Sequence, residues 1–88
     1  MHPYPYPPCE SFGCDSRECC GRGYKFTWPN VVGMTKDEAI AIIVRDNPLV
    51  TIVLRSEGHR WRILDFCCNR VWLDIDANNR VCLEPEVG

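Results

Sequence analysis

The 88-residue chain lacks the features that mark several large classes of protein. It has no apolar run close to the roughly 20 residues that a membrane span needs, so we expect no membrane partner. It has no long basic run and its formal net charge is −2, which argues against binding to nucleic acid. Its length excludes a two-domain enzyme, a doubly wound nucleotide-binding fold and a TIM barrel. What remains is one small domain.

Motifs for catalysis and for cofactor binding are also missing. No serine stands in a nucleophile-elbow setting, and no glycine-rich phosphate loop is present. His59 lies among arginines without a defined partner, which is more typical of a solvated side chain than of a general base or a metal ligand. A nucleophilic role for Cys67 or Cys68 would need a neighbouring base, and none is indicated. We therefore expect no enzyme activity, no catalytic residue and no cofactor.

Cysteine, in contrast, is abundant. The chain has 7 cysteines, a content typical of a disulfide scaffold in a short secreted protein, and the odd number leaves one thiol over. Residues 1–8 alternate proline with tyrosine and lack the apolar core of a signal peptide. We therefore expect a mature form from an oxidising compartment, secreted or vacuolar. The alternative is zinc held by four thiolates, but the tight Cys-x2-Cys knuckles of structural zinc sites are absent, and we expect no metal at Cys9, Cys14, Cys19 and Cys20.

The best secondary-structure signal is a helix that starts after Thr35. Thr35 and Glu38 form a capping box, and apolar residues follow at helical spacing as far as Arg45. Asn47-Pro48 ends the pattern. By contrast, residues 9–25 contain almost no aliphatic side chain, so this segment can hold a shape only through disulfides or a metal.

Three strands are predicted after the helix. Residues 50–54 are largely β-branched and predict a buried strand, whereas residues 71–76 alternate and predict a strand with one solvated face. A turn at residues 78–79 and a short return strand at 81–83 follow. The sequence therefore predicts an α+β fold, with one α-helix packed on a small mixed β-sheet, a long exposed binding loop at 56–69, and a cysteine-rich N-terminal extension.

Apolar side chains in the predicted loop indicate where function resides. A plain loop would not carry Trp61, Ile63, Leu64 and Phe66. They either fold back onto the core, as we expect of Phe66, or are displayed to a partner.

Two separated motifs resemble those of a known family. The run Trp-Pro-Asn-Val-Val-Gly at residues 28–33 is similar to the Trp-Pro-x-Leu/Val-Val-Gly signature of the potato inhibitor I family of serine protease inhibitors. The run Asp-Phe-Cys-Cys-Asn-Arg-Val-Trp at residues 65–72 is similar to the corresponding run of its disulfide-bearing seed members, and residues 85–88 resemble the Pro-x-Val-Gly end of the family. The resemblance covers roughly residues 20–88. It divides the chain into an extension at 1–19, rich in proline, tyrosine and cysteine, and a family-like domain at 20–88.

The resemblance implies an inhibitor that acts like a substrate. Family members present a rigid, extended loop to a protease active site, so little entropy is lost on docking and the reactive bond is cleaved slowly. Counting back from Cys68 places this bond at Leu64-Asp65. Counting forward from Gly58 instead gives Ile63 as the residue that enters the specificity pocket, because the segment is one residue longer than in the family. We adopt Leu64, because residues that match the family motif follow it.

The resemblance also assigns residues around this bond. Arg70 is expected to support Asp65 from the strand beneath, and Trp72 stands where some members have a second arginine. Ile63 replaces the threonine usual in the family, whose hydroxyl tethers the loop. The remaining expected contacts of the binding loop come from Arg60, Trp61, Arg62 and Phe66.

Disulfides are the last feature that the resemblance implies. Cys68 matches the cysteine that ties the loop to the N-terminal part of the chain, with Cys20 as the preferred partner and Cys19 as the runner-up. Cys67 is expected to form a second tie to Cys9, Cys14 or Cys19. Cys82 either pairs with another N-terminal cysteine or carries the odd thiol.

A leucine that enters the specificity pocket favours chymotrypsin-like or subtilisin-like serine proteases, whose pockets are apolar. Trypsin is disfavoured, because its pocket carries a carboxylate. We expect a monomer with a role in defence. The alternative is a non-inhibitory cysteine-rich binding or defence module on the same scaffold, which uses the loop or the proline-tyrosine tail in another way.

Overall fold

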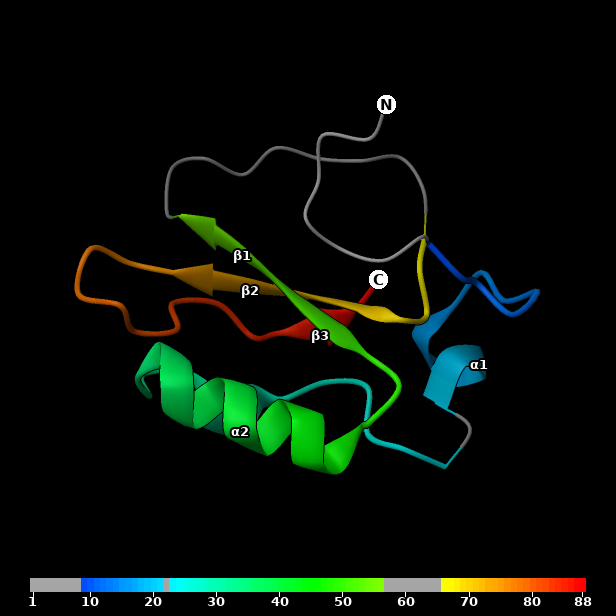
Figure 1. Ribbon diagram of the computed structural model, residues 1–88, viewed down its shortest axis with the longest axis horizontal. Coiled ribbons are helices and arrows are strands. Elements are labelled where there is room, and N and C mark those ends of the chain that lie inside the picture. The colour runs from blue at the N-terminus through cyan, green and yellow to red at the C-terminus, as the bar shows by residue number, and fades with distance from the viewer. Residues whose placement is uncertain (1–8, 22, 57–65) are drawn as a thin grey trace.

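The computed structural model describes residues 9–21, 23–56 and 66–88. The chain forms α1 (Arg17–Gly21), the 3-10 turn η1 (Pro29–Val31), α2 (Lys36–Asp46), β1 (Thr51–Ser56), β2 (Arg70–Ile75) and β3 (Glu86–Val87). Figure 1 shows α2 along one face of the sheet and α1 beside the start of β2. No helix in these parts of the chain is long and apolar enough to span a membrane.

The capping box at the start of α2 is confirmed in both directions. The Glu38 backbone N–H donates to Thr35 Oγ1 at 3.3 Å, and the Thr35 backbone N–H donates to Glu38 Oε1 at 3.2 Å. The helix runs one residue beyond the prediction, to Asp46. Asn47 is buried at its end, where its side chain donates to the Lys25 backbone oxygen and accepts from the Leu49 N–H.

The sheet is mixed, as predicted, in the order β1-β2-β3. β1 and β2 are parallel, in a register that runs from Thr51 opposite Arg70 to Ser56 opposite Ile75. β3 is antiparallel to β2, with Val87 opposite Val71. Because β1 and β2 are parallel, the chain must cross from one end of the sheet to the other between them. This crossover contains the predicted binding loop.

The core lies between α2 and the sheet. The largest fully buried side chains include Trp28, Ile43 and Leu73. The Trp28 indole N–H donates to Asp46 Oδ2 at 3.1 Å, which satisfies its polar atom inside the core. The family-like Trp-Pro motif therefore has a packing role, because it joins the segment before α2 to the end of that helix.

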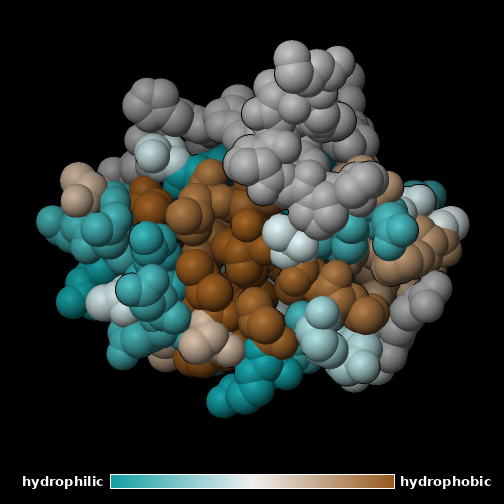
Figure 2. Space-filling model, viewed as in Figure 1, coloured by the Kyte–Doolittle hydropathy of each residue, from teal (hydrophilic) through white to brown (hydrophobic). Residues whose placement is uncertain are grey.

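The predicted strand at residues 50–54 is present, but its extent and its burial differ from the prediction. β1 continues to Ser56, and of its six residues only Val53 is buried. Leu54 is 43% exposed because β1 is an edge strand of the sheet. Figure 2 shows apolar side chains gathered on this face of the molecule, over β1 and α2.

The predicted return strand at residues 81–83 is confirmed only in part. No strand forms there, but the Asp76 N–H donates to the Arg80 oxygen at 2.9 Å and the Cys82 N–H donates to the Asp74 oxygen at 3.0 Å. Val81 forms only an isolated bridge to Ile75. Its N–H donates to the Met34 backbone oxygen at 2.9 Å, and its own oxygen accepts from the Gly33 N–H at 2.9 Å. Val81 therefore lies between β2 and the segment before α2, and its own N–H and oxygen face that segment. Continuous pairing with β2 comes later, at β3.

The capping box predicts a pH-dependent stability. The Thr35 hydroxyl and the Thr35 backbone N–H both donate to the Glu38 carboxylate, which holds its pKa below the usual value of 4.5. A pKa lowered by folding stabilises the fold above the unfolded-state pKa, and this contribution is lost as the pH falls through the folded-state pKa. We expect Glu38→Gln to lower the melting temperature at neutral pH, with the difference from the wild type closing in acid. Circular dichroism melts across this range measure it, and a pH-independent difference would contradict it.

Candidate functional site

The site is built around residues 66–70, which are the described end of the predicted binding loop, 66–69, and Arg70, the first residue of β2. Phe66 is half-buried and packs against the core, as the sequence analysis expected. Cys67 and Cys68 are buried, so this end of the connection is not the exposed loop that was predicted. The other expected loop residues lie outside the described residues, and their roles stay predictions: Arg60, Trp61, Arg62, Ile63, Leu64 and Asp65.

Two disulfides hold this segment to the N-terminal part of the chain. Cys20 on α1 pairs with Cys68, which is the pairing that the resemblance favoured. Cys9 pairs with Cys67, one of the three partners left open. Because Cys67 and Cys68 are adjacent in the chain, the two bridges lie next to each other in the segment before β2. The adjacent cysteines therefore fix the chain from two residues after Asp65, the residue that follows the predicted reactive bond.

Backbone hydrogen bonds reinforce the disulfides from both chain ends. The Cys68 N–H donates to the Glu10 oxygen at 2.7 Å, and the Glu10 N–H donates to Asn69 Oδ1 at 3.0 Å. The Cys67 N–H donates to the Gly88 backbone oxygen at 3.0 Å. Residues 67–69 are thus bound by segments near both termini. The boundary between an extension at 1–19 and a domain at 20–88 stays a prediction, but Cys9 and Glu10 are bound to the domain.

Arg70 is buried beneath this segment, with 2% of its surface exposed. Its Nε and Nη2 both donate to the Gly88 backbone oxygen, at 2.9 and 2.6 Å. Its guanidinium carbon lies 4.5 Å from the centre of the Trp72 ring. Arg70 therefore joins β2 to the C-terminal segment. Its predicted support of Asp65 concerns a residue that the structure does not describe, and it stays a prediction.

Arg55, at the end of β1, is a member of the site that the sequence did not indicate. Its Nε and Nη2 donate to the two carboxylate oxygens of Asp74, at 2.8 and 3.0 Å, and its guanidinium carbon lies 4.6 Å from the centre of the Trp72 ring. The side chains of Arg55 and Asp74 are only 15% and 6% exposed. The predicted solvated face of β2 is therefore wrong, because its charges are paired and largely buried. This pairing follows from the parallel register, which sequence alone does not fix.

The three remaining cysteines are one further disulfide pair and Cys82. Cys14 pairs with Cys19, and Cys82, in none of the three disulfides, lies with its Sγ 3.4 Å from the Asp74 backbone oxygen. The four cysteines of the zinc alternative are all in disulfides, so the disulfide interpretation holds in this structure. Thiolate ligands would require these bonds to be reduced.

The three disulfides are expected to differ in their effect on stability. Cys9–Cys67 and Cys20–Cys68 span 58 and 48 residues, whereas Cys14–Cys19 spans 5. In the loop-closure description, each long bridge acting alone would contribute about 4 kcal/mol and the short one about 2 kcal/mol. Because the two long bridges close overlapping loops, removal of one while the other remains should cost less than its full figure, about 3 kcal/mol, which is still more than removal of the short bridge. Paired Cys→Ser variants compared by urea unfolding measure this order. A larger loss from removing Cys14–Cys19 than from removing either long bridge would contradict it.

The Arg55–Asp74 pair is expected to behave as a largely buried ion pair. Removal of one charge by Arg55→Met or Asp74→Leu should cost about 3–5 kcal/mol, because the partner stays in a site with little water. The double variant should recover part of this loss. A double-mutant cycle by urea unfolding measures the coupling, and additive single losses would contradict it.

The arrangement is similar to that of known inhibitors. A sequence profile of the Potato inhibitor I family matches residues 20–88. The chain is 39% identical over 72 residues to a trypsin/subtilisin inhibitor of Amaranthus caudatus, which covers 82% of this chain and 99% of the relative. It is 39% identical over 64 residues to an inhibitor of trypsin and Hageman factor of Cucurbita maxima, which covers 73% and 93%.

A solved structure gives the same result for the fold. The crystal structure of bitter gourd trypsin inhibitor matches with a TM-score of 0.68 at 35% identity, over 74% of this chain and 94% of that one. The profile spans most of the chain, and the relatives are matched over nearly their whole length. The chain therefore belongs to the potato inhibitor I family of serine protease inhibitors.

Proposed function

We propose that this protein inhibits a serine protease, as a monomer and without enzyme activity of its own, by presenting residues 60–66 as a substrate-like loop with Leu64-Asp65 as the reactive bond. The observation that carries the proposal is the anchoring of the chain directly after that bond. Cys67 and Cys68 are buried, disulfide-bonded and hydrogen-bonded to Gly88 and Glu10.

This anchoring supports inhibition over turnover for a physical reason. A protease releases its product when the chain on the leaving side of the cleaved bond moves away. Here that side begins two residues before the Cys9–Cys67 bridge, so a new amino terminus at Asp65 stays close to the enzyme. The reverse reaction, which re-forms the bond, then competes with hydrolysis. A loop fixed beforehand also loses less conformational entropy on binding.

The Cys9–Cys67 bridge lies close in sequence to the positions where this chain departs from the family motif. Ile63 removes the hydroxyl tether, and the connection is one residue longer than expected. The Cys9–Cys67 bridge adds a covalent tie at the same end of the loop. We propose that this bridge compensates for the lost tether.

The expected targets follow from Leu64. An isobutyl side chain suits the apolar pockets of subtilisin-like and chymotrypsin-like proteases, and it offers no charge to the carboxylate in the pocket of trypsin. The relative from Amaranthus caudatus is named for both trypsin and subtilisin. We propose that this chain inhibits subtilisin, as that name indicates for the relative, and that it does not inhibit trypsin.

An oxidising compartment is part of the proposal. Six of the 7 cysteines form disulfides in the described residues, which fits a secreted or vacuolar protein with a role in defence.

A matched pair of substitutions tests which residue enters the pocket. We expect wild-type protein to inhibit subtilisin and chymotrypsin stoichiometrically and to spare trypsin. Leu64→Arg should tighten binding to trypsin by about a hundredfold or more, because an arginine can pair with the buried carboxylate of its pocket. Ile63→Arg, one residue earlier, is the control and should gain no trypsin inhibition. Titration of each protease at equal concentrations measures the result.

Two outcomes would overturn parts of this proposal. Trypsin inhibition by Ile63→Arg and not by Leu64→Arg would move the reactive bond by one residue. No inhibition of any of the three proteases by the wild type, in fully oxidised form, would favour the alternative of a non-inhibitory binding module.

A further inference from the structure

A cluster of three sulfur atoms joins two different disulfides. The Sγ atoms of Cys14, Cys20 and Cys68 all lie within 4.8 Å of one another. Cys20 and Cys68 are bonded to each other, but Cys14 is bonded to Cys19. Thiol–disulfide exchange requires a thiolate to reach a sulfur of another disulfide. If Cys14 were reduced, its thiolate would already stand beside both sulfurs of the Cys20–Cys68 bridge.

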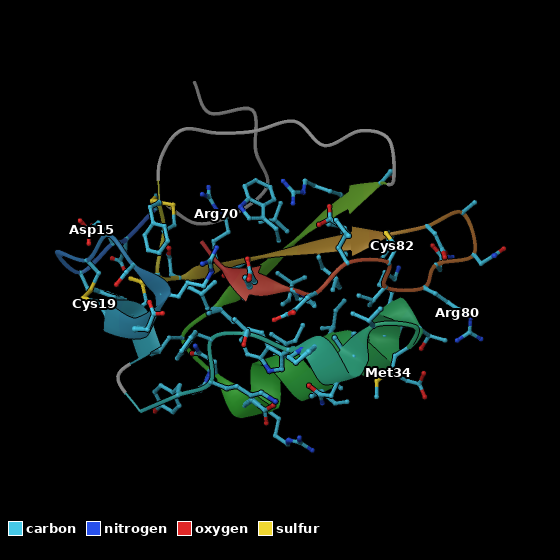
Figure 3. All side chains as sticks on the ribbon, turned by 180° about the vertical axis from the view of Figure 1, so that it is seen from behind. Asp15, Cys19, Met34, Arg70, Arg80 and Cys82 are labelled. Atoms are coloured by element: carbon cyan, nitrogen blue, oxygen red, sulfur yellow. A yellow bond between two sulfur atoms is a disulfide. The ribbon has the colours of Figure 1, made fainter. Side chains whose placement is uncertain are left out.

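The two disulfides differ in their access to solvent. Cys19 is exposed on α1, and Figure 3 shows it on the outer side of that helix. Cys20 and Cys68 each expose only 2% of their surface. The residues between Cys14 and Cys19 include Asp15 and Ser16, which are also exposed. A dissolved reductant therefore meets the short Cys14–Cys19 bridge first.

We propose that Cys14–Cys19 is a redox site for dithiol reductants, which passes reducing equivalents through Cys14 to the buried Cys20–Cys68 bridge. In the first step, a thiolate of the dithiol attacks Cys19 Sγ. The Cys14–Cys19 bond breaks, and its electron pair leaves on Cys14. The second thiol of the dithiol then closes onto the first, so the dithiol departs as a cyclic disulfide and Cys19 takes up a proton.

In the second step, the Cys14 thiolate attacks Cys20 Sγ or Cys68 Sγ. A new disulfide forms at Cys14, the Cys20–Cys68 bond breaks, and the displaced sulfur leaves as a thiolate and is protonated. In total, one dithiol loses two electrons and the protein goes from three disulfides to two. The new thiols are Cys19 and either Cys20 or Cys68. The buried bridge is opened although the reductant never contacts it.

The relay would change how the segment before β2 is held to the N-terminal part of the chain. The Cys20–Cys68 bridge is one of the two covalent ties of that segment, and the relay exchanges or removes it while Cys9–Cys67 remains. This relay does not depend on the proposed protease inhibition, so either can fail without the other.

Two single substitutions give a matched test of the relay. Cys19→Ser leaves Cys14 with a thiol inside the sulfur cluster, whereas Cys14→Ser leaves the thiol on Cys19, which is not among the three clustered atoms. At mildly alkaline pH without added reductant, peptide mapping by mass spectrometry should find Cys14–Cys20 or Cys14–Cys68 in Cys19→Ser. The Cys14→Ser protein should retain Cys20–Cys68. Only native Cys20–Cys68 in both variants would overturn the relay.

A kinetic measurement on the wild type keeps the test independent of how the single variants fold. The second step is intramolecular, at an effective concentration of order 1 mM, which exceeds about 0.1 mM dithiothreitol roughly tenfold, so the first step limits the relay. Cys20–Cys68 should therefore open in the wild type at nearly the rate at which the exposed Cys14–Cys19 bridge is reduced. It should open at least severalfold more slowly in Cys14→Ser/Cys19→Ser, where dithiothreitol must reach the buried bridge itself. Samples taken during the reaction are quenched in acid and alkylated with N-ethylmaleimide, and mass spectrometry then identifies which cysteines have become free thiols. Label on Cys14 and Cys19 together, with Cys20–Cys68 intact, would refute the relay, as would equal opening rates in the two proteins.

Discussion

Residues 67–69 are held at one time by three distant parts of the chain, and the rest of the functional architecture depends on this junction. The Cys68 N–H bonds to Glu10, the Cys67 N–H bonds to Gly88, and the Asn69 oxygen accepts from the Thr51 N–H at 2.8 Å. Two disulfides lie at the same place. A domain of this size has a thin core, so covalent ties and buried polar contacts must fix what apolar packing cannot. Here they fix the chain beside the proposed reactive bond.

Side chains on the face of the sheet opposite α2 also hold the two ends of the crossover in place. Two guanidinium groups, from Arg55 and Arg70, lie over the Trp72 ring, one from each of the strands that the crossover connects. Asp74 neutralises the first, and the Gly88 backbone oxygen accepts from the second. The end of β1 and the start of β2 are thereby linked through one aromatic side chain. A connection whose two ends are fixed relative to each other has fewer conformations to lose on binding.

The features that sequence predicted well are those with local signals. The capping box at Thr35 needs only two residues three positions apart, and the helix, the mixed sheet and the family motifs followed from short patterns. The errors arose where a distant partner decides the outcome. β1 is exposed at Leu54 because it is an edge strand, and the return after the turn at 78–79 pairs with β2 over one bridge only, while Val81 also bonds to residues 33–34. The Arg55–Asp74 pair depends on a parallel register, which no local spacing specifies. Residues 17–21 contain two cysteines and no apolar stripe, so α1 was not predicted.

The most direct test of the anchoring is a time course of oxidised wild-type protein with an equimolar amount of subtilisin. Residual activity and the mass of the inhibitor would be followed in the same samples. A fixed leaving side predicts that activity falls at once and stays low, while the inhibitor remains intact or reaches a constant ratio of intact to singly cleaved protein. Activity that returns as Leu64-Asp65 is progressively cut would show that the protein is a substrate, and that the two disulfides do not hold the loop as described.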